Sequence, residues 1–299
     1  MEFYLREKLE YWIVLFFMKF VKFVPEKLTF VILNFFGKLA YLLLSKRRKL
    51  TIKNISLAFP SKNNKEAKAL AYKNFLSIAR TIAEILLIVS KKQKLEDFVE
   101  NKEEALERYL EVTKERQENQ GMIFISGHFG NWELFGNYFA SKGLNITAIG
   151  RRGDNRLIED NITTPFRESY GNLNVHKSEA INAMIKTLRD GGRVGILIDQ
   201  KAGSSGLRTT FFGRECSTTA SVAIMKLKYK PLIIPGFAIR QESGKSKLVF
   251  FEPVEYVADE KESKEERLIA ITQKYNDVFE NIVKEYPEQW FWMHNRWKI

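Results

Sequence analysis

The sequence predicts an α/β protein, with a mixed central sheet flanked by helices and an N-terminal hydrophobic helical segment before it. Two observations carry this prediction: short apolar runs bounded by turn residues alternate with segments of helical spacing, and residues 11–44 form two long apolar runs. The chain has 299 residues, of which 45% are hydrophobic, enough for a substantial core. Its single cysteine excludes a disulfide scaffold and a four-cysteine zinc site.

The N-terminal segment combines apolar runs with positive charge. Residues 1–60 hold 11 Lys or Arg against 4 Asp or Glu, so over half of the net charge of +12 lies in this fifth of the chain. A transmembrane helix needs about 20 nearly uninterrupted apolar residues, and lysines divide each candidate window: Lys19, Lys22, Lys27 and Lys38. Lysine stems can lie along an apolar surface while the ammonium reaches a headgroup layer. We therefore expect residues 1–45 to attach the chain to a membrane and residues 46–299 to form the α/β domain. The alternative is two amphipathic helices packed on the domain, with their lysines in water.

The basic run KRRK at residues 46–49 directly follows the apolar block. Such a run attracts anionic lipid at about 1 kcal/mol per charge. Nucleic-acid binding would need a known reading module, or basic residues interleaved with exposed aromatics, and neither pattern is found. Phospholipid headgroups are therefore the expected partner of this run.

The order of elements follows from periodicity and turn residues. Helices are expected at residues 64–90, 102–118, 155–170, 178–190, 217–228 and 262–286. Strands are expected at residues 122–126, 145–150, 172–176, 193–198, 231–239 and 247–252. Chemistry in such a sheet gathers where loops leave the carboxyl ends of strands.

The first such loop, GHFGNWE at residues 127–133, holds the strongest candidate site. His128 leaves the strand end, and a turn at Gly130 can bring Glu133 back to one ring nitrogen while the other faces substrate. A carboxylate in that position fixes the tautomer of a general base and stabilises its imidazolium form. Backbone N–H groups near Asn131, where a helix begins, can stabilise developing negative charge. The alternative is a surface histidine beside a helix-capping glutamate.

GHFGNWE closely resembles the H-x4-D/E motif of glycerolipid-type acyltransferases, in the variant found in the late acyltransferases of lipid A biosynthesis. Further stretches resemble the same family in order along the chain. They are residues 53–60 (KNISLAFP), residues 166–171 around Arg167, Asp199-Gln200, residues 211–213 (FFG) and the aromatic, basic C-terminus at residues 290–298.

The resemblance implies a reaction in which a fatty acyl chain passes from acyl carrier protein to a hydroxyl of a lipid A precursor. His128 would be the general base, oriented by Glu133, and Gly130, Asn131, Arg167 and Asp199 would be further residues of the site. Arg167 would hold a phosphate or stabilise the oxyanion, and Asp199 would support the site. Taken alone, Arg167 could equally form a surface salt bridge, and Asp199 could equally end a strand in a turn.

The resemblance also implies partners and a location: acidic acyl carrier protein, an anionic lipid and the cytoplasmic face of the inner membrane. The excess positive charge of the chain suits such partners. No cofactor or metal is expected, because the sequence has no P-loop, no dinucleotide glycine pattern and no His/Cys ligand cluster.

Three other residues have side chains that could take part in a reaction or bind a ligand. Cys216 precedes an expected helix and could take the acyl group first, but it is no part of the family pattern. His176 is expected to be structural, and His294 could contact a headgroup or serve C-terminal packing. Two other functions stay open, an acyltransferase for another glycolipid or phospholipid, such as a mannosylated phosphoinositide, and a non-catalytic lipid- or nucleic-acid-binding protein.

Overall fold

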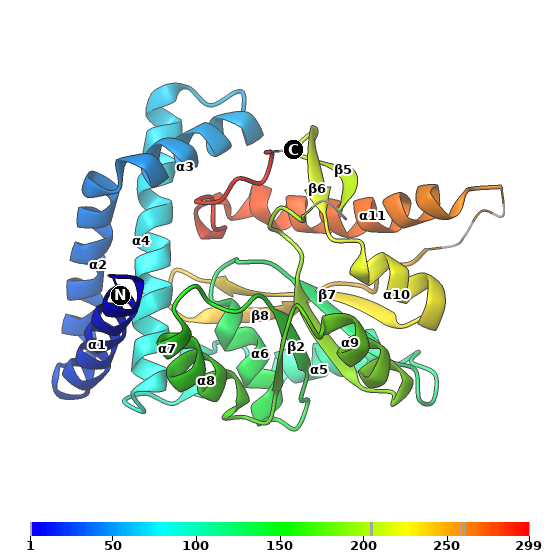
Figure 1. Ribbon diagram of the computed structural model, residues 1–299, viewed down its shortest axis with the longest axis horizontal. Coiled ribbons are helices and arrows are strands. Elements are labelled where there is room, and N and C mark those ends of the chain that lie inside the picture. The colour runs from blue at the N-terminus through cyan, green and yellow to red at the C-terminus, as the bar shows by residue number, and fades with distance from the viewer. Residues whose placement is uncertain (1, 204–205, 257–258, 260, 299) are drawn as a thin grey trace.

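The computed structural model describes residues 2–203, 206–256, 259 and 261–298, and its centre is a six-stranded mixed sheet (Figure 1). The strands lie in the order β3-β2-β4-β1-β7-β8, and all neighbours are parallel except the antiparallel pair β7 and β8. They span β1 (Met122–Ser126), β2 (Thr147–Gly150), β3 (Leu173–His176), β4 (Arg193–Leu197), β7 (Leu232–Arg240) and β8 (Ser246–Phe250). The predicted α/β class with a mixed central sheet and all six predicted strands are confirmed, and no strand end is shifted by more than two residues.

Helices cover both faces of the sheet, and β1 is therefore buried on both sides. Met122 and Phe124 point into a core shared with α5 (Lys102–Thr113) and α6 (Trp132–Ser141). Ile123 and Ile125 point to the opposite face. That face is covered by α9 (Ala180–Arg189), α10 (Ser221–Tyr229) and the long α11 (Lys264–Glu285). A fully apolar strand between two helical layers is the pattern of a parallel sheet.

The N-terminal helices pack beside this body through α4 (Figure 1). They are α1 (Glu2–Phe23), α2 (Glu26–Leu43), α3 (Ser45–Ala58) and α4 (Asn64–Val89). A capping box between Asn63 and Glu66 begins α4. The helices α2 and α4 approach closely at Gly37, where an added Cβ would lie 2.7 Å from the Cβ of Ala79. Over the described residues, no single helix is long and apolar enough to cross a membrane, and α2 and α3 reach that length and composition only as a pair bent by 87°.

The helix expected at residues 217–228 was predicted wrongly at its beginning. Residues 217 and 218 belong to a strand, since β5 (Leu207–Phe211) and β6 (Arg214–Thr218) form a hairpin and α10 begins only at Ser221. The helical stretch expected at residues 155–170 is confirmed as one run from Arg156 to Glu168, made of α7 (Arg156–Ile158), the π-helical turn η2 (Glu159–Thr163) and α8 (Thr164–Glu168). Among the described residues there are also two short 3₁₀ helices, η1 (Leu95–Phe98) and η3 (Pro287–Gln289), and η3 leads into the C-terminal residues.

Candidate active site

His128 lies where the sequence predicted it, in the loop that leaves the carboxyl end of β1. Its ring Nδ1 is 2.9 Å from Oδ1 of Asp199, and its backbone N–H donates to Oδ2 of the same carboxylate at 3.0 Å. Asp199 follows β4, the neighbour of β1 in the sheet, so two parallel strands deliver the two residues to one edge. The site is therefore a His128–Asp199 dyad.

The electrostatics of the dyad suit a general base. Asp199 is 1% exposed. Burial opposes its ionisation, but His128, His294 and the indole N–H of Trp290 together hold the pKa of Asp199 far below its ordinary value. Burial likewise disfavours the imidazolium form of His128, yet the charge and hydrogen bond of Asp199 outweigh it and raise the pKa of His128. With an ionised carboxylate accepting from Nδ1–H, the lone pair of Nε2 is left to take a proton.

The prediction that Glu133 orients His128 was wrong. Glu133 lies in the first turn of α6, and its carboxylate accepts two bonds from Nε of Arg167 on α8, at 3.1 and 3.0 Å. Both side chains are largely buried, with 12% of Glu133 and 25% of Arg167 exposed. No hydrogen bond joins Glu133 to His128 among the contacts of the described residues, and its charge is only a lesser cause of the raised pKa of His128. Glu133 thus fixes Arg167, not the base.

Arg167, expected as a further residue of the site, lines the cavity next to Glu133. Burial lowers the pKa of Arg167, but the carboxylate of Glu133 more than compensates and raises it, so the guanidinium stays charged. It lies beside the carboxyl end of β2, where an added Cβ on Gly150 would be 3.9 Å from its Nη1. A fixed cation at this place can bind negative charge that is present or that develops on a substrate.

Gly130 and Asn131, the two further residues expected at the site, shape the loop that carries His128. Gly130 has a φ of +55°, and an added Cβ would lie 1.9 Å from the carbonyl oxygen of Ala238, so only glycine fits. Asn131 is fully buried: its Oδ1 accepts from the N–H of Leu134 as the N-cap of α6, and its Nδ2 donates to Glu84. Both residues position His128 through the backbone.

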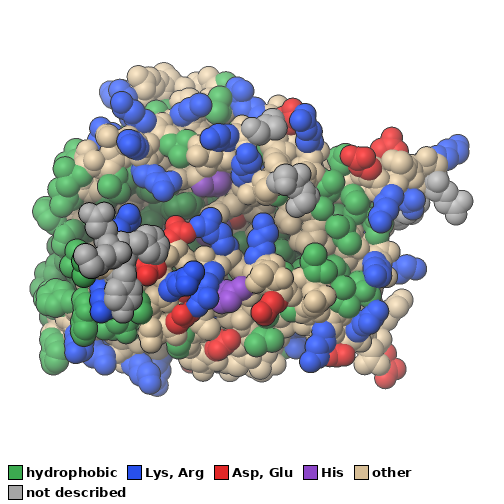
Figure 2. All heavy atoms as spheres, in the orientation of Figure 1, with side chains coloured by type: hydrophobic (Ala, Val, Ile, Leu, Met, Phe, Trp, Pro, Cys, Tyr) green, Lys and Arg blue, Asp and Glu red, His purple; other side chains and the backbone are tan. Residues whose placement is uncertain are grey.

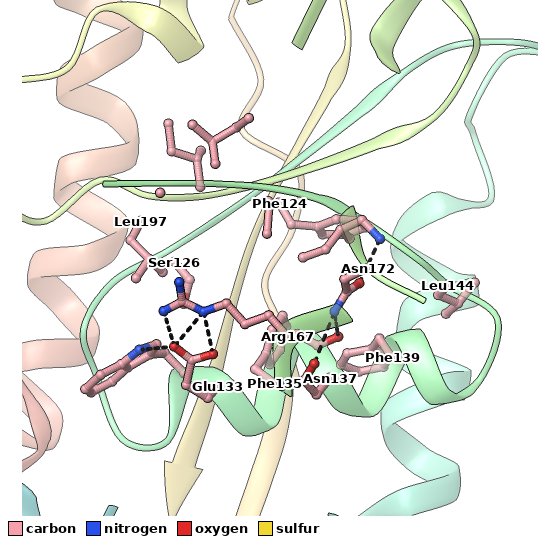
Figure 3. A pocket seen from close by; sticks show the side chains of 18 of the residues that line it. Phe124, Ser126, Glu133, Phe135, Asn137, Phe139, Leu144, Arg167, Asn172 and Leu197 are labelled. Atoms are coloured by element: carbon pink, nitrogen blue, oxygen red, sulfur yellow. Dashed lines mark hydrogen bonds and ion pairs between the residues drawn. The ribbon is translucent and has the colours of Figure 1, made fainter. Parts of the chain in front are cut away.

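An apolar cavity of about 130 Å³ opens beside the dyad, between α6 and the sheet. Ser126, Glu133 and Arg167 lie together at one side of it, and Phe139, Leu144 and Asn172 lie at the other (Figure 3). Trp132 connects the cavity to the dyad, since it lines the cavity and its ring centroid is 5.2 Å from that of His128. The wall is mostly hydrocarbon and aromatic: Tyr109, Phe124, Phe135, Phe139, Leu144, Ile146, Ala148, Ile196, Leu197 and Phe250. Sequence reasoning did not find this lining, because its residues come from four strands, two helices and the loop between α6 and β2, with no common motif.

The C-terminal segment reaches the dyad as well, which the sequence did not indicate. Trp290 Nε1 donates to Oδ2 of Asp199 at 2.9 Å. His294 faces two backbone carbonyls, those of Phe291 at 2.8 Å from Nδ1 and of Asp199 at 3.2 Å from Nε2. Of its two open roles, these contacts favour the one in C-terminal packing.

The remaining candidates lie outside the dyad. His176 ends β3, the edge strand of the sheet, three positions from β1. Cys216 is fully buried within β6, beside the hydroxyl of Thr209, so its thiol is enclosed by the fold. In the part of the chain that the structure describes, no group of three His, Cys, Asp or Glu residues could hold a metal ion.

An α/β fold with a half-buried histidine paired to a buried carboxylate, beside a hydrocarbon-lined cavity, suits the transfer of acyl chains, and comparison with known proteins identifies this class. The model of the family "Bacterial lipid A biosynthesis acyltransferase" matches residues 3–299, and the chain belongs to this family. It is accordingly an O-acyltransferase of lipid A biosynthesis.

Relatives with assigned activities agree in class and differ in the acyl chain named. The chain is 25% identical over 273 residues to the lipid A biosynthesis lauroyltransferase of Escherichia coli (strain K12), covering 88% of this chain and 82% of the relative. It is 23% identical over 272 residues to the myristoyltransferase of the same strain, covering 90% and 80%. With the palmitoleoyltransferase it shares 22% over 276 residues, covering 88% and 82%.

Proposed function

We propose that this protein is a membrane-bound acyltransferase that moves a fatty acyl chain from an acyl carrier protein thioester to a hydroxyl of a lipid A precursor. The observation that carries the proposal is the His128–Asp199 dyad next to an apolar cavity. A base beside a hydrocarbon pocket brings a hydroxyl and an acyl carbonyl together.

The proposed reaction is direct transfer. Nε2 of His128 takes the proton of the acceptor hydroxyl while the hydroxyl oxygen attacks the thioester carbonyl carbon. Asp199, hydrogen-bonded to Nδ1, stabilises the imidazolium that forms. The carbon–sulfur bond then breaks, the new ester is released, and the carrier thiolate takes the proton back from Nε2. A thioester is already activated for this step, so the proposal includes no cofactor and no metal.

Arg167 and the cavity are proposed to hold the substrate. The guanidinium of Arg167, fixed by Glu133, faces negative charge at the cavity entrance, either the oxyanion or a phosphate of the acceptor. The acyl chain lies among the aromatic and aliphatic side chains of the cavity. Burying a methylene there is worth about 0.8 kcal/mol.

Attachment to the cytoplasmic face of the inner membrane is proposed from the surface of α1 and α2. Apolar side chains gather over these helices (Figure 2). Nine strongly exposed apolar side chains belong to these two helices: Leu5, Leu9, Trp12, Phe16 and Phe23 in α1, Val31, Phe35, Leu42 and Leu43 in α2. Exposed apolar surface of this extent marks an interaction site. Lys46 and Lys49 on the adjoining α3 are also exposed, so they can contact anionic headgroups. The net charge of +12 favours an acidic carrier protein as the donor.

The proposal is tested by mass spectrometry of a lipid A precursor incubated with the purified protein and acyl carrier protein thioesters of several chain lengths. The wild type is compared with His128→Ala, and Cys216→Ser serves as the matched control for a thiol mechanism. We expect one acyl mass to be added by the wild type and by Cys216→Ser, and almost none by His128→Ala. No gain from any thioester by folded, vesicle-bound wild type would refute the proposed acceptor or donor. Loss in Cys216→Ser alone would refute direct transfer.

A further inference from the structure

The C-terminal segment at residues 288–294 lies between the N-terminal helices and the catalytic loop. On one side, Nδ2 of Asn74 donates to the carbonyls of Glu288 and Trp290, and Nδ2 of Asn54 donates to those of Trp292 and His294. These carbonyls belong to every second residue, so two asparagines from α4 and α3 hold the segment at four points along its length. Its position is therefore set by four side-chain hydrogen bonds rather than by a strand of the sheet.

On its other side the same segment contacts the dyad. The N–H of Phe291 donates to the carbonyl of His128 at 2.9 Å, and Phe129 pairs with Trp290 in an isolated β-bridge. This pairing directs the indole of Trp290, which is fully buried, towards Oδ2 of Asp199. The carboxylate then has three donors: the ring and backbone N–H groups of His128 and the indole N–H.

We propose that Trp290 is a positioning residue of the reaction, whose indole N–H fixes the Asp199 carboxylate and so sets the orientation and proton affinity of His128. The proposal rests on the proposed function, because it assigns a role within the same site. It does not make Trp290 a catalytic residue, since the indole touches the carboxylate and not the reacting atoms.

The expected effect has a definite sign. A donor to a carboxylate stabilises its charge, so loss of the indole N–H makes Asp199 a stronger acceptor for the imidazolium and raises the pKa of His128. Other charged groups also face the dyad: Glu133 from α6 raises the pKa of His128 and Arg167 from α8 lowers it. His294 of the segment and Arg296, two residues beyond it, lie near Asp199. None of these is changed in the variant, so the shift reports the indole alone.

The chain offers a matched control in Trp292. Both indoles are fully buried, and their ring centroids are 4.4 Å apart. The indole N–H of Trp292, however, donates to the carbonyl of Pro287 and not to the dyad. Replacement of either tryptophan by phenylalanine therefore removes similar volume and one hydrogen bond, but only Trp290→Phe acts on Asp199.

The test measures the pKa of His128 without substrate, from the pH dependence of its modification by diethyl pyrocarbonate, followed by peptide mass spectrometry on the full chain in detergent. We expect an upward shift of about half a pH unit in Trp290→Phe, and none in Trp292→Phe. In an Asp199→Asn background, Trp290→Phe should produce no further shift, because its effect passes through the carboxylate.

Transfer to the lipid A precursor supplies the second reading. We expect kcat to fall about tenfold in Trp290→Phe at unchanged KM, and to stay within about twofold in Trp292→Phe, with similar melting temperatures. Equal shifts in both variants, or a shift that persists in Asp199→Asn, would overturn the positioning role. Because the modification needs no acyl transfer, failure of the proposed function would leave this result readable.

Discussion

Replacing Asp199 by asparagine is expected to lower kcat by at least about a hundredfold, whereas Glu133→Gln is expected to lower it less than about tenfold. The comparison separates the two carboxylates near His128. One is within hydrogen-bond distance of Nδ1, and the other is bound to Arg167. If the glutamate of the H-x4-E spacing were the partner of the base, the order of the two losses would be reversed.

The magnitude follows from two effects of Asp199. A hydrogen bond to an ionised group contributes about 1.5–3 kcal/mol, and here it strengthens as His128 becomes charged in the transition state. Each 1.36 kcal/mol is about a tenfold change in rate, so this bond alone accounts for roughly one to two powers of ten. An asparagine amide can also donate to Nδ1, which places the imidazole proton on Nε2 and removes the lone pair that must accept the substrate proton.

The pH profile of kcat/KM gives an independent check. In the wild type the raised pKa of His128 puts the acidic limb above the ordinary histidine value of about 6.5, and activity rises with pH through it because only the neutral ring is a base. In Asp199→Asn burial is left as the largest influence, so the pKa of His128 falls and the limb moves to lower pH. In Glu133→Gln the limb moves down only slightly. A larger loss of kcat and a larger shift in Glu133→Gln than in Asp199→Asn would refute the assignment of the dyad.

Three further predictions follow from the loop, the cavity and the surface. Gly143→Ala is expected to lower the free energy of unfolding by about 1 kcal/mol, because Gly143 has a φ of +80° but open space around it. In Gly130→Ala the new Cβ also meets a carbonyl oxygen, so the loss should be several-fold larger and transfer should be abolished. Denaturant unfolding and activity assays measure both effects. Phe139→Ala should shift the preference towards longer thioesters in competition assays, because Phe139 lines the cavity on the side away from Arg167, and an unchanged preference would place the acyl chain elsewhere. Trp12→Ser with Phe16→Ser should weaken co-sedimentation with anionic vesicles at least about tenfold, and undiminished binding would mean that α1 does not enter the interface.

The fold was largely predictable from local patterns. Strand β1 is a continuous apolar run between glycines, and the predicted bounds are the observed ones. The β5–β6 hairpin was missed because LRTTF and RECST alternate polar and charged residues with few apolar ones. Their pairing depends on distant contacts, above all the amide of Asn276 in α11, which donates to the hydroxyls of Thr209 and Thr218. Such contacts leave no periodic signal along the strands themselves.

The base was predictable and its partner was not. His128 is recognisable because a histidine directly follows a buried strand within a glycine-containing turn. Asp199 lies 71 residues away in sequence, and only the strand order, with β4 beside β1, brings it to the ring. Glu133 is close in sequence, but a residue in the first turn of α6 projects sideways from the helix, where Arg167 meets it. Short spacing thus favoured the wrong carboxylate.

The contacts around the dyad also connect the catalytic residues to the helices proposed to lie on the membrane. Asn54 and Asn74, which hold the C-terminal segment against the catalytic loop, belong to α3 and α4, and α2 packs along α4. If α1 and α2 lie on the membrane as proposed, the helices that meet the bilayer are one layer away from the indole that contacts Asp199. The membrane-facing helices and the base are then connected through α3 and α4. This connection sets the distance of His128 from the bilayer, where a lipid acceptor from the membrane and a thioester from the aqueous side would meet.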